Sequence, residues 1–220
     1  MVVWALGLLP AAKMAVDALT GGLGANPVEA VLNRLGFWAL TFLAVSLAPT
    51  PAREILGLAG TGRLRRPLGL LAFAWGTLHL AFYVAVDRFF DLRTLAADVT
   101  RRPFLVVGFA AWLLLLPLAV TSTDGWMRRL GGARWRRLHR LVYPAALLAL
   151  VHFLWRVKAD RRRPLVFAVV VGLLLLARVP GWVRAARRRR ATAVPMPPPG
   201  TGGTGRGVAP PGVAGRGTAR

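Results

Sequence analysis

The sequence predicts an all-α membrane protein: a bundle of six transmembrane helices followed by a disordered C-terminal tail. The chain has 220 residues, 55% of them hydrophobic, and its mean hydropathy is +0.52. The apolar residues form long blocks, and most charged residues fall between these blocks. A soluble domain of this size would spread its charges along the chain. Apolar blocks separated by charge are instead typical of helices that cross a membrane.

Six apolar segments are candidates for these spans, each of which needs about 20 residues. They are Val2–Leu19, Gly36–Leu47, Leu68–Val86, Phe104–Val120, Leu138–Val157 and Leu165–Val179. The second and sixth segments are short, so we expect both to extend into flanking residues. The first segment could alternatively be a cleaved signal peptide, but it lacks a basic start and contains Lys13 within its apolar stretch.

The charge balance indicates how the bundle is oriented. The net charge is +22, from 30 Lys and Arg against 8 Asp and Glu. Such an excess can indicate nucleic-acid binding, but here the arginines flank the apolar segments or lie in the tail. With six spans both termini share one side, and more arginines fall on that side than on the other. The positive-inside rule therefore predicts a bacterial inner-membrane protein with both termini in the cytoplasm.

The C-terminal residues 184–220 differ from the rest of the chain. They begin with a run of arginines and, from Ala191 onward, are rich in Pro, Gly and Thr with almost no large apolar side chain. Such a composition cannot bury a hydrophobic core. We therefore predict that residues 1–183 form the transmembrane domain and that residues 184–220 are a basic, disordered cytoplasmic tail.

Three histidines are the residues most able to carry chemistry. The chain has no cysteine, which excludes disulfides, thiolate metal sites and covalently attached c-type haem. His79 lies in the third segment, and His139 and His152 lie in the fifth. Ionisable side chains inside a membrane are costly and usually functional. Because imidazole is the usual axial ligand of haem iron, we interpret all three as candidate haem ligands. Alternatively, they only form hydrogen bonds between helices.

The spacing of the histidines favours one pairing. His79 lies thirteen residues after the cytoplasmic Arg66, and His152 lies thirteen residues after His139. At 1.5 Å per residue each reaches about 19 Å into the membrane. His79 and His152 are therefore expected at one height in the outer leaflet, where they could bind one haem iron from both faces. His139 lies at the cytoplasmic mouth opposite Arg66, so it either holds a haem without a second histidine or has another task.

The neighbours of these histidines are compatible with a flat porphyrin. Gly76, Ala145 and Ala149 lie on the ligand faces and leave room for a ring, although small residues are equally common wherever membrane helices pack closely. Aromatic side chains could line the ring or anchor the helices at the membrane interface. These are Trp75, Tyr83, Trp135, Tyr143 and Trp155.

The sequence contains no nucleotide-binding motif and no soluble domain that could hold a dinucleotide. We expect the electron donor to be a small molecule, a quinol or a separate protein. We therefore interpret the chain as a redox subunit without a catalytic residue of its own. Two alternatives remain at this point: a stand-alone ferric or quinone reductase of the cytochrome b type, and a small membrane transporter with structural histidines.

Four stretches of the sequence resemble one protein family. They are GGLGANPVE, LLAFAWGTLHLAFYVAVD, RRPFLVVGFAAWLLLLPLAVTSTDGWMRRLG and ARWRRLHRLVYPAALLALVHFLWRVKAD. The family is MsrQ, also called YedZ, the haem-binding membrane subunit of the periplasmic methionine-sulfoxide reductase system. The resemblance covers about residues 21–183 and leaves out the C-terminal tail. The chain departs from the family at its N-terminus, where the first span is shorter than in the family.

The resemblance implies a six-helix transmembrane domain of ferric-reductase-like type with b-type haem and flavin mononucleotide (FMN). It implies that electrons come from the quinone pool or from a cytosolic flavin reductase. They pass to a periplasmic molybdopterin subunit, MsrP, which repairs oxidised methionines in proteins. His79, His139 and His152 fall on the histidine positions of the family. The charged loops 87–102 and 158–163, on the expected periplasmic side, are candidates for docking that partner.

Overall fold

The computed structural model describes part of the chain, namely residues 2–157, 160–181 and 183. The predicted disordered tail, residues 184–220, lies outside this part. The chain divides into two units, residues 1–180 and 181–220, and the helices described below belong to the first. This unit is all-α: the residues that the structure describes contain no β-strand.

Long helices make up most of the first unit. They are α1 (Val2–Leu19), α2 (Pro27–Leu47), α4 (Arg65–Phe82), α6 (Pro103–Val120), α8 (Val142–Arg156) and α9 (Arg162–Leu176). The other helical segments are α3 (Pro49–Leu56), α5 (Leu92–Arg101), α7 (Asp124–Leu138), which is kinked at Gly131, the 3₁₀ turns η1 (Thr61–Leu64) and η3 (His139–Leu141), and the π-helical turn η2 (Tyr83–Asp87). Counting continuous helical stretches, six within the described residues are long and apolar enough to cross a membrane. The prediction of a six-helix membrane bundle is confirmed.

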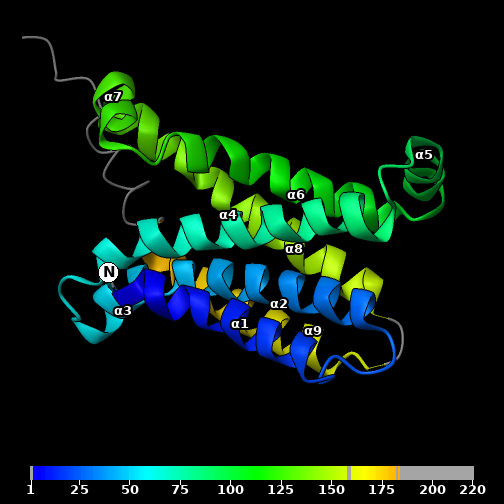
Figure 1. Cartoon of the computed structure of the whole chain (residues 1–220). Coiled ribbons are helices and arrows are strands. Elements are labelled where there is room, and N and C mark those ends of the chain that lie inside the picture. The colour runs from blue at the N-terminus through cyan, green and yellow to red at the C-terminus, as the bar shows by residue number, and fades with distance from the viewer. Residues whose placement is uncertain (1, 158–159, 182, 184–220) are drawn as a thin grey trace, which may run out of the picture. The chain divides into compact units, whose positions relative to one another are not determined.

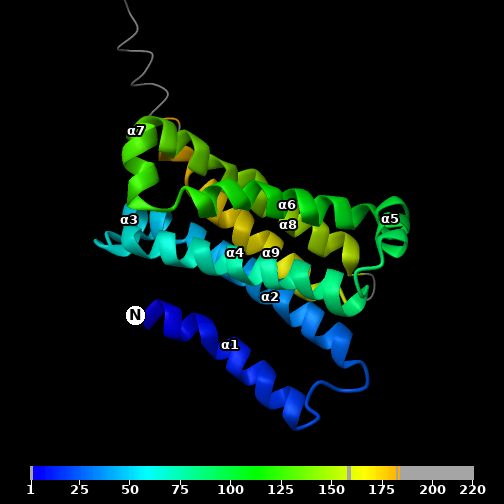
Figure 2. The ribbon, with the colours of Figure 1, turned by 45° about the horizontal axis from the view of Figure 1, so that its top comes forward.

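Helices α2, α4, α6 and α8 form the centre of the bundle (Figure 1). α2 packs along α4, and α6 packs along α8, while α4 also contacts α6 and α9 contacts both α2 and α8. Figure 2 shows α1 at the margin of the bundle, where it contacts α4 and α2. One end of the bundle carries α5 and is called the α5 end. The opposite end carries α3, α7 and the start of α1 and is called the α7 end (Figure 1).

Small side chains allow the central helices to approach one another. The buried core combines alanines from α2, α4 and α8 with leucines from α2 and α6 and one valine from α9. It contains Leu43, Ala44, Leu47, Ala72, Leu115, Leu118, Ala145, Ala146 and Val171. Many large apolar side chains on α1, α6 and α9 are exposed instead, as expected for surfaces that face lipid tails.

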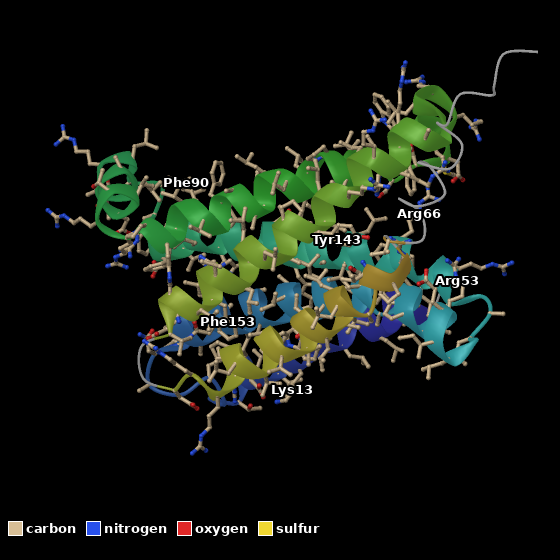
Figure 3. All side chains as sticks on the ribbon, turned by 180° about the vertical axis from the view of Figure 1, so that it is seen from behind. Lys13, Arg53, Arg66, Phe90, Tyr143 and Phe153 are labelled. Atoms are coloured by element: carbon tan, nitrogen blue, oxygen red, sulfur yellow. The ribbon has the colours of Figure 1, made fainter. Side chains whose placement is uncertain are left out.

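An arginine joins α9 to the end of α2. Pro51 has no backbone N–H, so it cannot donate the helical hydrogen bond to the carbonyl of Leu47, four residues earlier. The buried guanidinium of Arg178 donates to that carbonyl instead, and it lies 5.2 Å from the ring centre of Tyr143. Arg178 therefore satisfies a polar group that the proline leaves open and fixes α9 against α2 at the α7 end. Figure 3 shows Tyr143 and the exposed Arg53 and Arg66 toward this end.

The structure contains helical residues outside the predicted apolar segments, namely in α3, α5, α7 and the start of α2. α2 begins at Pro27, nine residues before the predicted Gly36, because the Asn26 side chain accepts a hydrogen bond from the N–H of Glu29 and caps the helix at 3.2 Å. The predicted loop 87–102 contains the amphipathic helix α5. Its first turn is capped by Asp91, whose carboxylate accepts from the N–H groups of Arg93 and Thr94. In both regions a capping residue starts a helix outside the predicted apolar segments.

Candidate functional site

Two of the three histidines face each other across the centre of the bundle. His79 lies on α4 and His152 on α8, with ring centres 6.2 Å apart and ring planes at 79° to each other. Imidazole nitrogens bind metal ions at about 2 Å, so two rings on opposite sides of one ion have their centres about 6 Å apart. The observed separation therefore suits one metal ion between the two rings. The predicted pairing of His79 with His152 at one height agrees with this placement.

Hydrogen bonds fix the tautomer of both rings. The Nδ1 of His79 lies 3.0 Å from the carbonyl oxygen of Leu32 on α2, and the Nδ1 of His152 lies 2.7 Å from that of Phe104 on α6. A carbonyl oxygen can only accept a hydrogen bond, so each Nδ1 carries the proton and donates it. Each Nε2 is left with a free lone pair. This is the usual arrangement of a histidine that binds a metal ion.

Glycines in α2 and α6 leave the space that these rings occupy. A Cβ atom added to Gly36 would lie 3.1 Å from the Cε1 of His79. One added to Gly108 would lie only 2.5 Å from the Nδ1 of His152, a distance that Cβ atoms essentially never show. Each glycine lies one helical turn after the residue whose carbonyl accepts the imidazole proton. Each histidine is thus held by a carbonyl and a glycine of the preceding long helix.

Both histidines line a cavity of about 810 Å³ between α2, α4, α6 and α8. Toward the centre of the bundle its walls are apolar, whereas charged side chains gather toward the α5 end. The apolar part includes Leu40, Leu43, Ala72, Ala111 and Leu115, and the charged part includes Glu29, Asp87, Arg88, Arg102, Arg156, Asp160 and Arg163. The cavity therefore suits a largely apolar ligand with one polar edge.

The other residues singled out from the sequence have separate locations. Gly76, Tyr83 and Ala149 line the cavity, whereas Ala145 belongs to the buried core. Trp75 is buried and donates a hydrogen bond to the carbonyl of Gly7 on α1 at 3.2 Å. Trp155 lines a neighbouring cavity at the α5 end. Of the predicted aromatic lining, only Tyr83 faces the cavity that contains the two histidines.

The structure does not bring His139 to the other two histidines. At the α7 end its ring stacks on Trp135, with centres 3.9 Å apart and planes at 26°. Its Nε2 lies 3.0 Å from the Thr121 hydroxyl, which itself donates to the carbonyl of Pro117 at 2.6 Å. A hydroxyl has one proton to donate, so His139 Nε2 donates here. The Trp135 Nε1 also donates to the Thr121 carbonyl at 2.8 Å, and these bonds join α6 to α7 and η3.

A polar network at the α5 end connects the cavity to α5. The carboxylate of Asp98, which is only 7% exposed, accepts a hydrogen bond from the Tyr83 hydroxyl at 2.8 Å. The same carboxylate pairs with Arg88 at 2.8 Å and with Arg102 at 3.2 Å. Tyr83 lies in the π-helical turn η2, a local irregularity that is frequent at functional sites. α5 is thereby held at the charged end of the cavity.

The fold is that of a helical membrane protein in which two histidines face each other beside a cavity between the central helices. Residues 35–150 match the family described as ferric reductase like transmembrane component. This range contains α4, α6 and most of α2 and α8; it includes His79 and ends two residues before His152.

Curated relatives show to which family within this class the chain belongs. A protein of Rhodospirillum rubrum is 51% identical over 188 residues, which are 86% of this chain and 89% of the relative. One from Xanthomonas euvesicatoria is 44% identical over 212 residues, 91% of this chain and 96% of the relative. One from Herminiimonas arsenicoxydans is 47% identical over 174 residues, 78% and 80% of the two chains. Each is named protein-methionine-sulfoxide reductase heme-binding subunit MsrQ. The chain belongs to the MsrQ family, as its sequence motifs predicted.

Proposed function

We propose that this chain is the membrane electron-transfer subunit of a protein-methionine-sulfoxide reductase system and holds b-type haem between His79 and His152. The observation that carries this proposal is the facing pair of imidazoles, whose Nδ1 atoms are bonded to carbonyls and whose Nε2 atoms remain available. The names of the relatives, which call them heme-binding subunits, support it. His139, which is held by Thr121 and Trp135, is the least suited of the three histidines to serve as a ligand.

The residues around the cavity fit a haem. His79 and His152 would hold the iron of the haem, and the porphyrin would supply the ligands that two imidazoles alone lack. When bound, haem supplies a one-electron Fe(III)/Fe(II) couple. The carbonyls of Leu32 and Phe104 orient the two rings and raise their basicity through the Nδ1 hydrogen bonds. The apolar side chains that α2, α4 and α6 contribute to the cavity would limit the access of water to the iron.

We place the α7 end in the cytoplasm and the α5 end in the periplasm of the bacterial inner membrane. The exposed arginines of α7 and of the segment before α4 support this orientation through the positive-inside rule. Both the start of α1 and the end of α9 lie toward the α7 end. Reporter fusions test it: a periplasm-active enzyme fused after Asp98 should be active, and one fused after Gly125 silent. The reverse pattern would overturn the orientation.

The remaining parts of the proposal concern what delivers and receives the electrons. By family resemblance, the donor is the quinone pool or a cytosolic flavin reductase, with FMN as a second cofactor. The acceptor is the periplasmic subunit MsrP, docked on the charged loops at the α5 end, beside the charged part of the cavity. Because the pair lies nearer this end, an electron would have only a short distance to travel to a docked protein.

The direct experiment uses the full chain purified in detergent. We expect a red protein whose reduced-minus-oxidised spectrum has the sharp Soret and α bands of low-spin haem. Mixing the reduced protein with purified MsrP in a stopped-flow instrument should give rapid reoxidation. Changing Arg161 and Arg162, which do not line the cavity, together to Glu should slow that step and leave the spectrum unchanged. A colourless protein would contradict the proposal and favour a transporter. Haem that reduces ferric iron or quinone but is not oxidised by MsrP would favour a stand-alone reductase.

A further inference from the structure

The cavity that contains the two histidines is polar at one end only, and this asymmetry is informative about how a ligand would lie in it. The walls near the bundle centre are leucines and alanines, while the end near α5 holds four arginines and three carboxylates. A b-type haem is itself asymmetric, because two carboxylate side chains extend from one edge of an otherwise apolar ring. Burying those carboxylates among leucines would be strongly unfavourable. The carboxylate edge would therefore face the α5 end.

Two of the four arginines are closely connected to His152. Arg156 lies one helical turn after His152 on α8 and so projects from the same side of the helix. Arg102 lies two residues before Phe104, whose carbonyl holds the His152 ring. Both line the cavity of the two histidines and also a second cavity that adjoins it at the α5 end, together with Glu29. They therefore stand where the carboxylate edge of a ring held by His152 would emerge.

The remaining two arginines are less suited to this role. Arg88 is largely covered and already engaged, since its Nε lies 2.8 Å from Asp98 and 3.3 Å from Asp87. Arg163 lies on α9 and does not line the second cavity. In contrast, Arg156 makes a single contact with Glu29 through Nη2 at 3.3 Å. Arg102 contacts Asp98 through Nε at 3.2 Å. Each of these two guanidinium groups has further N–H donors beyond those contacts.

We infer that Arg102 and Arg156 bind the two carboxylates of the haem and thereby set the orientation of the ring between His79 and His152. The inference rests on the proposed function. A guanidinium group pairs with a carboxylate through two parallel hydrogen bonds, which fix direction as well as charge. Arg102 and Arg156 are positioning residues in this arrangement, because they act on the ring edge and not on the iron.

The first test is the midpoint potential of the haem in the purified full chain. Arg102→Gln and Arg156→Gln each remove a positive charge from the carboxylate edge, which favours the ferric state, so the potential should fall in both. Arg156→Lys should restore most of the parental value. Arg101→Gln is the matched control, because Arg101 is exposed and lines the second cavity but not the cavity of the two histidines. Its potential should equal that of the parent.

The second test replaces the haem by its dimethyl ester, which has no carboxylate charges. The full-length protein stripped of haem is reconstituted with either form, and the retained haem is measured after extensive dilution. With haem, Arg102→Gln and Arg156→Gln should lose it several-fold faster than the parent. With the dimethyl ester, parent and variants should behave alike. A variant that binds neither form has lost its fold, and that result would count against a positioning role.

The outcomes separate this inference from the proposed function. If the parent binds no low-spin haem, the proposed function itself fails. If the haem is normal but the arginine variants match Arg101→Gln in potential and retention, only the assignment of the carboxylate partners fails. Equal shifts with haem and with its dimethyl ester would show that the arginines act at a distance, and this would also overturn the assignment.

Discussion

The two ends of the bundle place histidines in opposite situations. In the half of the bundle nearer the α5 end, His79 and His152 each donate an Nδ1 proton to a carbonyl of α2 or α6, and both rings line one cavity. At the α7 end, His139 has no second histidine near it among the described residues. Its Nε2 is bonded to Thr121 and its face is covered by Trp135.

Under the proposed function, this difference separates a histidine that binds the haem iron from one that only stabilises the bundle. All three imidazoles are hydrogen-bonded, so hydrogen bonding alone does not distinguish them. What distinguishes the pair is that each bond engages the nitrogen away from the cavity and leaves the other nitrogen available beside a partner ring. The hydrogen bond of His139 to Thr121 and its stacking on Trp135 instead help to join α6, α7 and η3, which stabilises the fold without any cofactor.

The largest expected effect is the loss of the paired ligands. His79→Gly and His152→Gly should each abolish the low-spin haem spectrum, because the iron loses one of its two axial nitrogens. Adding imidazole to either variant should restore much of that spectrum, since the small ligand can occupy the space left by the ring. The absorbance of the reduced α band measures both effects. A normal spectrum in either variant without imidazole would mean that the iron is bound elsewhere.

A smaller but still clear effect is expected at the glycine against which His152 packs. Gly108→Ala places a methyl group 2.5 Å from Nδ1, so the ring must move, and overpacking of this kind typically costs about 1–3 kcal/mol. The haem content of the purified protein should fall severalfold. Gly172→Ala on α9 is the matched control, because a Cβ there has no neighbour within 4 Å. Equal haem content in the two variants would contradict the packing account.

A change at the α7 end should act on stability and not on the cofactor. His139→Ala removes the hydrogen bond to Thr121 and the stacking on Trp135, which together should cost about 1–2 kcal/mol of unfolding free energy. Thermal unfolding in detergent should therefore begin at a lower temperature, while the spectrum of the His79–His152 haem stays normal. If this variant instead lost that haem, the contrast between the two ends would be wrong.

The smallest effect concerns the helix beside the cavity at the α5 end. Hydrogen bonds from the Thr94 hydroxyl, and then from the N–H groups of Thr94 and Arg93, lower the pKa of Asp91 below its ordinary value of 3.8. A lowered pKa stabilises the folded state above the ordinary value, and this stabilisation is lost as the pH falls through the folded-state pKa. Amide exchange at the start of α5 should speed up in that acidic range. Asp91→Asn keeps the cap without titrating, so its exchange protection should not show this change.

Much of the fold followed from the sequence, because the apolar segments are long and the helical rise is fixed. The same rise placed His79 and His152 at one height. The roles of Gly36 and Gly108 were missed, because they depend on how closely α2 approaches α4 and α6 approaches α8. The sequence nevertheless contained two parallels between these glycines. Each glycine is followed by phenylalanine within an apolar helix. The residue with the bonded carbonyl and its histidine are 47 residues apart for Leu32 and His79 and 48 residues apart for Phe104 and His152.

The helix α5 was missed for a different reason. Its ten residues lie in a stretch that is too polar and too short to be a span, so the pattern of apolar blocks assigns it to a loop. The helix depends on the cap at Asp91 and on the contacts of Asp98 with Tyr83 and Arg88, which join residues distant in sequence. The contacts of Asp98 are tertiary, and the order of residues along the chain does not reveal them. The Asp91 cap is local, but the pattern of apolar blocks does not register it.

The most direct test of the central claim is an electron paramagnetic resonance spectrum of the oxidised protein. The two ring planes lie at 79° to each other, so each imidazole would act on a different d orbital of the iron. The two orbitals would then remain nearly equal in energy. The g values of the low-spin ferric haem should therefore spread widely. The account predicts this strongly anisotropic signal in the parent and in His139→Ala, and its loss in His79→Gly and His152→Gly. A high-spin signal in the parent, or a low-spin signal that survives loss of either paired histidine, would contradict it.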